Sequence, residues 1–199
     1  MNTGIALTLS LASASALTAA EFRFSTHKID DIQIGYGIQI ADVNGDGKVD
    51  ILLADKSTVQ WYQAPDWQKH IIASGLTEKD NVCITARDLD GDGKCEIAVG
   101  AQWNPGNTTD PKESGAVFQL VPGKDRTAPW KPVRLHNEPT VHRMHWIKSA
   151  DGRYSLVVKP LHGRGNKNGE GKGGLILEYH PANAGEEWKM ETVSDFMHL

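Results

Sequence analysis

Cysteines and clusters of basic residues are scarce in this 199-residue sequence, and their scarcity argues against several classes of protein. Two cysteines, Cys83 and Cys95, cannot form the disulfide framework of a small secreted scaffold. The formal net charge is −4 and no run of Lys or Arg occurs, which argues against a nucleic-acid partner. A phosphate-binding loop, a dinucleotide-binding glycine motif and a nucleophile elbow are also missing, so nothing indicates nucleotide binding or serine-hydrolase chemistry.

Long apolar runs are absent after the N-terminal segment, so no membrane span is expected in the mature chain. Residues 1–20 carry no charge and end in small residues. This pattern predicts a signal peptide cleaved near Ala20 and a secreted or periplasmic mature chain, residues 21–199. A buried N-terminal helix is the alternative. In an oxidising compartment Cys83 and Cys95 either form a disulfide or remain buried thiols, and the sequence leaves both open.

An acidic, glycine-containing segment is repeated along the chain. Residues 41–54 read ADVNGDGKVDILLA and residues 87–100 read RDLDGDGKCEIAVG, with their acidic positions in register. A third copy at residues 146–160 is eroded and keeps only Asp151 of the loop acids. After each copy come an apolar strand that ends in a proline and a further strand led by tryptophan. The first two copies begin 46 residues apart. The repeat decides the expected fold, because a period of this length is typical of proteins built from repeated structural units.

Each repeat unit holds about four short strands bounded by turn residues, and no segment has a sustained helical period. In the first unit, alternation predicts strands at residues 36–41, 50–54, 58–62 and 69–73. Four-stranded units of this length are typical of propeller blades, so the sequence predicts an all-β propeller, with a β-sandwich as the alternative. The expected blade units are residues 30–73, 74–136 and 137–195.

About three blades are therefore present, whereas closed propellers use about four to eight. The sequence predicts a partial propeller, whose open edges and inner faces would allow self-association. Residues 24–29 are similar to the tryptophan-led strand and are expected to form such a strand from a preceding unit.

The repeated acidic segments form loops at residues 42–50 and 88–96, with oxygen-bearing side chains at positions one, three, five and nine. Position seven offers its backbone carbonyl, and a glycine at position six permits a sharp turn, which suits a hard cation such as Ca²⁺. Without a cation the carboxylates would repel one another. An EF-hand is excluded, because Leu53 and Val99 stand where its bidentate Glu belongs and strands flank the loops. A solvated turn without metal is the alternative.

This loop pattern followed by an apolar strand resembles the FG-GAP/VCBS repeats of integrin α-chain propellers and of many secreted bacterial proteins. The resemblance covers nearly the whole chain after residue 20 and implies a propeller with structural calcium at about two sites. Because one fold hosts many functions, it specifies no activity. Carried over to this sequence, the implied ligands are Asp42, Asn44, Asp46, Asp50 and the Lys48 carbonyl, then Asp88, Asp90, Asp92, Glu96 and the Lys94 carbonyl. The third loop is expected to bind no calcium.

The third unit gains histidines where its loop loses acids, and they suggest a second site. Histidine with carboxylate suits Zn²⁺ or a similar transition metal, arginine holds anionic or polyhydroxylated substrates, and a His or Glu can abstract a proton. A regular strand cannot direct His142 and His145, three residues apart, to the same side, so His145 faces a neighbouring sheet or a bulge intervenes. Ordinary surface histidines are the alternative. The candidate catalytic residues are His142, His162, Glu138, Arg143 and Arg164.

This histidine-rich segment is distantly similar to the propeller of aldos-2-ulose dehydratase-like proteins and to propeller-shaped polysaccharide lyases, which would imply β-elimination or dehydration of a sugar. The sequence therefore supports three hypotheses. The first is a calcium-binding adhesion or recognition module for a carbohydrate or protein ligand. The second is a carbohydrate-active lyase or dehydratase with a metal site, and the third is a repeat remnant without independent function. The acidic loops and the export signal favour the first.

Overall fold

The computed structural model describes residues 22–182 and 186–197, so the predicted signal peptide at residues 1–20 lies outside the described residues. The chain divides into two units, residues 1–30 and residues 31–199. The described part of the first unit, residues 22–30, contains no strand. The strand predicted at residues 24–29 is therefore wrong, because this segment has no strand partner within the described chain.

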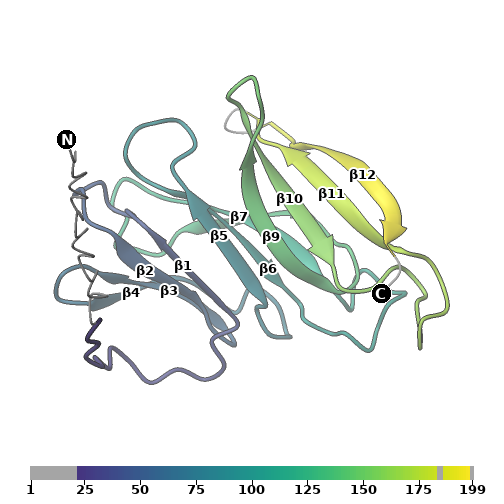
Figure 1. Ribbon diagram of the computed structural model, residues 1–199, viewed down its shortest axis with the longest axis horizontal. Helices are drawn as coiled ribbons and strands as arrows, with labels where there is room; N and C mark the ends of the chain where they lie inside the picture. The colour runs from purple at the N-terminus through teal and green to yellow at the C-terminus, as the bar shows by residue number, and fades with distance from the viewer. Residues whose placement is uncertain (1–21, 183–185, 198–199) are drawn as a thin grey trace, which may run out of the picture. The chain divides into compact units, whose positions relative to one another are not determined.

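The second unit contains twelve strands in three four-stranded sheets (Figure 1). The first sheet comprises β1 (Gly37–Ala41), β2 (Asp50–Ala54), β3 (Thr58–Gln63) and β4 (Gln68–Ser74). The second comprises β5 (Cys83–Arg87), β6 (Glu96–Ala101), β7 (Ala116–Val121) and β8 (Lys131–His136). The third comprises β9 (Val141–Lys148), β10 (Tyr154–Pro160), β11 (Gly174–His180) and β12 (Lys189–Met197). Within the described residues, no helix is long and apolar enough to cross a membrane.

Each sheet is an antiparallel meander in which strands pair in chain order. In the first hairpin the register runs from Gly37 opposite Ala54 to Ala41 opposite Asp50. The second hairpin repeats it, from Cys83 opposite Gly100 to Arg87 opposite Glu96. Each acidic loop thus closes a hairpin whose last pair contains the residue at loop position nine.

The three sheets stack face to face, with β5 between β1 and β9. One core cluster joins the first sheet, through Trp61 and Ile72, to the second, through Ile97 and Phe118. A second cluster joins the other face of the second sheet to the third, with Trp146 among its buried residues. Four-stranded antiparallel blades packed in sequence confirm the predicted all-β partial propeller of about three blades.

The outward-facing side chains of β1 are apolar and exposed. Ile38 and Ile40 in β1 are 64% and 69% exposed, whereas Ile84, which holds the position of Ile38 in the next repeat, is 3% exposed. Ile84 belongs to the core between the first and second sheets. In the second unit this position is buried between two blades, whereas in the first unit it is exposed, and self-association through this face stays a prediction.

The two cysteines are both free and buried. Cys83 lies in the core between the second and third sheets, and Cys95 lies in the core between the first and second. Burial raises the pKa of each thiol to about 12. Of the two states that the sequence left open, the structure has the buried thiols.

Candidate metal centre

The loop that joins β1 to β2 folds around the Asp42 carboxylate. Oδ1 of Asp42 accepts the Gly45 N–H at 2.7 Å, and Oδ2 accepts the Gly47 N–H at 2.8 Å. Both glycines have positive φ, at 82° and 79°, a region that side chains with a Cβ rarely adopt. Asn44 and Asp46 each accept the N–H two residues ahead, at 3.0 and 2.9 Å, which forms two Asx turns. The local sequence therefore dictates the loop geometry.

The loop that joins β5 to β6 repeats this arrangement. Asp88 accepts the Gly91 N–H at 2.7 Å and the Gly93 N–H at 3.0 Å, and these glycines have φ of 84° and 83°. Asp90 and Asp92 form the corresponding Asx turns at 3.0 and 2.8 Å. Two separate segments thus reach the same conformation, because the same residue types stand at the same positions.

The carboxylates at loop position nine are partly or wholly removed from water. Asp50 is fully buried, and its two oxygens accept the N–H groups of Val43 and Ala64, both at 2.9 Å. Glu96 accepts the N–H of Leu89 at 3.0 Å. Burial raises the pKa of Asp50 and of Glu96, and repulsion from the other loop carboxylates adds to it although the backbone hydrogen bonds oppose it. A nearby cation would offset the free-energy cost of keeping these two carboxylates ionised.

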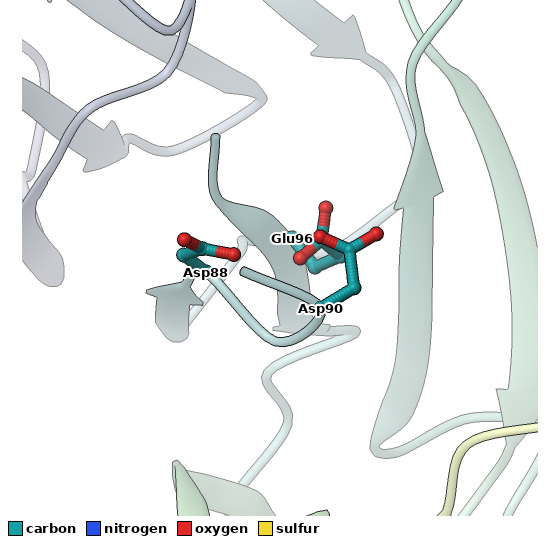
Figure 2. A group of neighbouring side chains, drawn as sticks. All are labelled: Asp88, Asp90 and Glu96. Carbon is teal, nitrogen blue, oxygen red and sulfur yellow. The ribbon is translucent and has the colours of Figure 1, made fainter. Parts of the chain in front are cut away.

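Three carboxylates of the second loop converge. An oxygen from each of Asp88, Asp90 and Glu96 lies within 4.8 Å of the others, and Figure 2 shows Asp90 and Glu96 side by side with Asp88 across the loop. The Asp92 carboxylate instead accepts a hydrogen bond from Lys94 Nζ at 3.0 Å. The converging atoms are all hard oxygen donors, which fit Ca²⁺ better than the nitrogen- and sulfur-seeking transition metals.

The first loop has the equivalent residues with less charge. Asn44 stands where Asp90 stands in the second loop, so its donor set holds one carboxylate fewer. Lys48 Nζ lies 3.7 Å from Asp46 Oδ2, as the equivalent lysine does in the second loop at a shorter distance. The structure gathers the predicted ligands in two loops of one geometry, and calcium binding itself stays a prediction.

The third loop, between β9 and β10, is closed by an arginine. Arg153 donates from Nε to Asp151 at 2.8 Å, and its Nη2 lies 2.7 Å from the same carboxylate oxygen. Ser149 Oγ also donates to Asp151. The Ser149 hydrogen bond and then the Arg153 guanidinium hold the pKa of Asp151 far below its usual value. The third loop thus balances its carboxylate with a cation of its own chain.

Two of the candidate catalytic residues form an ion pair between a buried carboxylate and an exposed guanidinium. Glu138 is 2% exposed, and Arg164 donates to it from Nε at 3.0 Å and from Nη2 at 2.7 Å. His136 Nε2 lies 3.7 Å from Oε2 of Glu138. Burial raises the pKa of Glu138, but hydrogen bonds and charge from His136 and Arg164 outweigh it and leave the pKa below its usual value. These contacts hold Glu138 as an ionised structural anchor in this arrangement.

His142 lies in a β-bulge of β9. Lys159 pairs with Arg143 and Pro160 pairs with Val141, so the register skips His142. Its ring stacks on Trp103, with centroids 5.1 Å apart. Burial, followed by the charges of Arg143, Lys159 and His162, lowers the pKa of His142. The imidazole is therefore held in its neutral form, which suits a metal ligand or a general base.

His162 and His145 lie in different surroundings. The Nδ1 atom of His162 is buried without a hydrogen-bond partner, while its backbone N–H donates to Thr140 Oγ1 at 3.0 Å. His145 is exposed and lies between the buried Met144 and Trp146 in β9, so it points away from the second sheet. Within residues 22–182 and 186–197, no third histidine, cysteine or carboxylate joins His142 and His162 in a metal-ligand group. Their proposed metal site stays a prediction.

Sequence reasoning missed Trp103, which follows β6 and stacks on His142. The two residues lie in different blade units, and no local pattern links a loop tryptophan to a histidine in the next blade. The bulge at His142 was among the alternatives that the sequence left open.

Comparison with known proteins agrees with the repeated loop geometry. Residues 42–99 match the family model of an FG-GAP-like repeat. The matched segment contains both acidic loops and the strands β2 to β5 between them. No curated protein matches the chain at a significant level. Residues 42–99 of this partial β-propeller are therefore an FG-GAP-like repeat.

Proposed function

We propose that this chain is a calcium-binding β-propeller module that acts outside the cytoplasm by binding a carbohydrate or protein ligand. The observation that carries the proposal is the convergence of Asp88, Asp90 and Glu96 oxygens within 4.8 Å, in a loop geometry that the chain builds twice. Carboxylates so close repel one another, and a divalent cation between them would turn this repulsion into attraction.

The donor chemistry favours calcium over other divalent ions. Calcium takes six to eight oxygen ligands in flexible geometry at about 2.3–2.6 Å, whereas magnesium demands a strict octahedron and zinc prefers nitrogen and sulfur. The first site would use Asp42, Asn44, Asp46, Asp50 and the Lys48 carbonyl. The second would use Asp88, Asp90, Asp92, Glu96 and the Lys94 carbonyl. For Asp92 this requires its carboxylate to leave Lys94, which the exposed position of both side chains permits.

The role of the ion follows from where the loops lie in the blades. Asp50 is the first residue of β2 and Glu96 is the first residue of β6, so an ion bound to either residue would tie the loop to the strand that follows it. The bound ion would stiffen the hairpins at this end of the blades, and stiff loops lose less conformational entropy when they engage a ligand. The FG-GAP-like repeat supports a binding role for the acidic loops, because their carboxylates would be occupied by the ion.

The chemistry of residues 1–20 supports export, and it is tested by fractionation of the expressing cells. Mature protein beginning near Glu21 in the periplasm or medium is the expected result. Retention of residues 1–20 on a cytoplasmic product would contradict it.

The calcium claim is tested by plasma mass spectrometry and titration calorimetry on the mature chain. About two calcium ions per chain are expected, with dissociation constants of about 10⁻⁴–10⁻³ M, the range of extracellular modules. Asp88→Asn is expected to abolish one site. Asp125→Asn is the matched control, because Asp125 also accepts hydrogen bonds within an exposed turn but lies outside the loops. Absence of calcium from the wild-type chain would overturn the proposal.

A sugar lyase or dehydratase is a second candidate, favoured by the neutral His142 stacked on Trp103 beside His162. Its test is one equivalent of a transition metal that disappears in His142→Ala and in His162→Ala. A chain that carries calcium only, and binds glycans without altering them, would remove this candidate.

A further inference from the structure

The two acidic loops contact each other directly. The backbone N–H of Cys95, next to Glu96 in the second loop, donates to the carbonyl of Asp42 in the first loop at 2.9 Å. The carbonyl of Cys95 in turn accepts a hydrogen bond from Arg126 Nη2. Asp42, Gly93 and Cys95 line one shared pocket. Asp42, the first proposed ligand of the first loop, is thus hydrogen-bonded to Cys95, which directly precedes Glu96, the last proposed ligand of the second loop.

Lys94 makes a second link between the loops. A Cβ placed on Gly45 would lie 2.9 Å from Cγ and 3.0 Å from Cε of Lys94, so the lysine stem lies directly against this glycine of the first loop. Its ammonium group meanwhile pairs with Asp92 in its own loop. The reverse contact is absent from the described residues, since nothing lies within 4 Å of a Cβ placed on Gly91, which holds the position of Gly45 in the second loop.

We propose that calcium binding at the two loops is positively coupled, and that Lys94 is the positioning residue that carries the coupling. This inference rests on the proposed calcium sites. Binding at the second loop would recruit the Lys94 carbonyl and order residues 88–96, which also orders the Lys94 stem and the Cys95 N–H against the first loop. The first loop then loses less conformational freedom when its own ion binds, and linkage makes the effect reciprocal.

Electrostatic repulsion between two bound ions acts in the opposite direction. At physiological salt, charges in solvent are screened over about 8 Å, and each ion would be largely neutralised by its own carboxylates. The packing and hydrogen-bond link is not screened in this way. Measurements at two ionic strengths therefore separate the contributions: the coupling is expected to increase with added salt.

The first experiment compares Lys94→Met with Lys94→Ala. Both variants remove the ammonium group, but only Lys94→Met keeps a stem against Gly45, so their difference reports the packing contact alone. Calcium is titrated into the mature chain, and the amide NMR signals of Gly45 and Gly47 report the first loop separately from those of the second. The affinity of the first loop is expected to be about fivefold weaker in Lys94→Ala than in Lys94→Met, the lower end of typical coupling.

Lys48 provides the matched control, because it occupies the same loop position and faces Asp46 in the same way. Lys48 does not contact Gly91 of the second loop in the way that Lys94 contacts Gly45, since nothing lies within 4 Å of a Cβ placed on Gly91. Lys48→Met and Lys48→Ala are therefore expected to give the same second-loop affinity, read from the amide signals of Gly91 and Gly93.

Alanine at the two equivalent glycines gives an independent measurement. Gly45→Ala and Gly91→Ala carry the same backbone strain, with φ of 82° and 84°, so each is expected to weaken its own loop. Only Gly45→Ala also displaces Lys94, so its effect on the affinity of the other loop is expected to exceed that of Gly91→Ala by about fivefold.

The outcomes distinguish this inference from the proposed function. Equal effects of Lys94→Met and Lys94→Ala on the first loop, with symmetrical effects of the two glycine variants, would overturn the coupling and leave two independent calcium sites. Wild-type amide signals that do not respond to calcium in either loop would overturn the calcium sites and the coupling with them.

Discussion

Asp50 is predicted to stabilise the first blade even without calcium, and Asp50→Ala tests this directly. The fully buried carboxylate accepts the N–H groups of Val43 and Ala64 at 2.9 Å each. Alanine leaves both donors buried without partners, at about 1–3 kcal/mol each. Relief of the buried charge and of its repulsion by Asp42 and Asp46 offsets part of this loss. We expect a net destabilisation of about 2–4 kcal/mol.

The assay is urea unfolding of the mature chain in chelator and in saturating calcium, with Asp46→Ala as the control. Asp46 is an exposed ligand candidate whose carboxylate holds only its own loop, so its loss is expected to remove the calcium-dependent stabilisation and leave the stability in chelator unchanged. Asp50→Ala is expected to lower stability under both conditions. If Asp50→Ala unfolds like wild type in chelator, the structural role assigned to the carboxylate is refuted.

Three further predictions concern residues that are not proposed calcium ligands. Cys83 and Cys95, with pKa values near 12, are expected to resist a thiol reagent at about pH 8 in the native chain and to react in denaturant; native-state reaction of either would contradict their burial. Gly115→Ala would bring a Cβ within 1.7 Å of the Glu138 carbonyl oxygen at a φ of 72°, so we expect a loss of roughly 3 kcal/mol or more in a thermal melt. Gly123→Ala, with open space around it, should melt like wild type. The pKa of Glu138 is lower in the folded chain than its ordinary value of 4.5, so the ionised carboxylate stabilises the fold at any pH above 4.5. This stabilisation is lost as the pH falls through the lowered pKa of the folded chain. Glu138→Gln is therefore expected to flatten the acid limb of a stability–pH curve. An unchanged acid limb would show that the ion pair contributes nothing.

The sequence predicted the blades well because the determinants of these strands are local. Alternation and turn residues placed the first four strands at residues 36–41, 50–54, 58–62 and 69–73, and the structure has them within a residue of these bounds. The acidic loops were equally readable, because the side chains at loop positions one, three and five bond to backbone groups two to five residues away. A segment that specifies its own hydrogen bonds can be read without knowing its neighbours.

The contacts between blades could not be read from the sequence. The hydrogen bond from Cys95 to Asp42 joins two loops, and the stacking of Trp103 on His142 joins two blades. Such pairs depend on how sheets stack, which no short pattern encodes. The strand predicted at residues 24–29 failed for the same reason: its composition suits a strand, but a strand needs a partner edge.

The candidate catalytic residues show what composition leaves undetermined, and their catalytic role stays a prediction. Glu138 and Arg164 have the chemistry of an active site, yet they pair with each other beside His136. A sequence reveals that a carboxylate and a guanidinium are present, but their mutual distance decides whether they act on a ligand or on each other. His142, displaced from the strand register by its bulge, forms no such ion pair with Glu138 or Arg164.

Arg153 gives the third loop a counter-ion that dialysis cannot remove. Because the guanidinium is covalently attached, its local concentration does not depend on the medium, and the loop keeps its charge balance in chelator and at low calcium alike. The five residues Ser149 to Arg153 therefore offer a design template. Transplanted into the equivalent hairpin loop of the first or second blade, they would give a turn whose carboxylate is balanced without any bound ion.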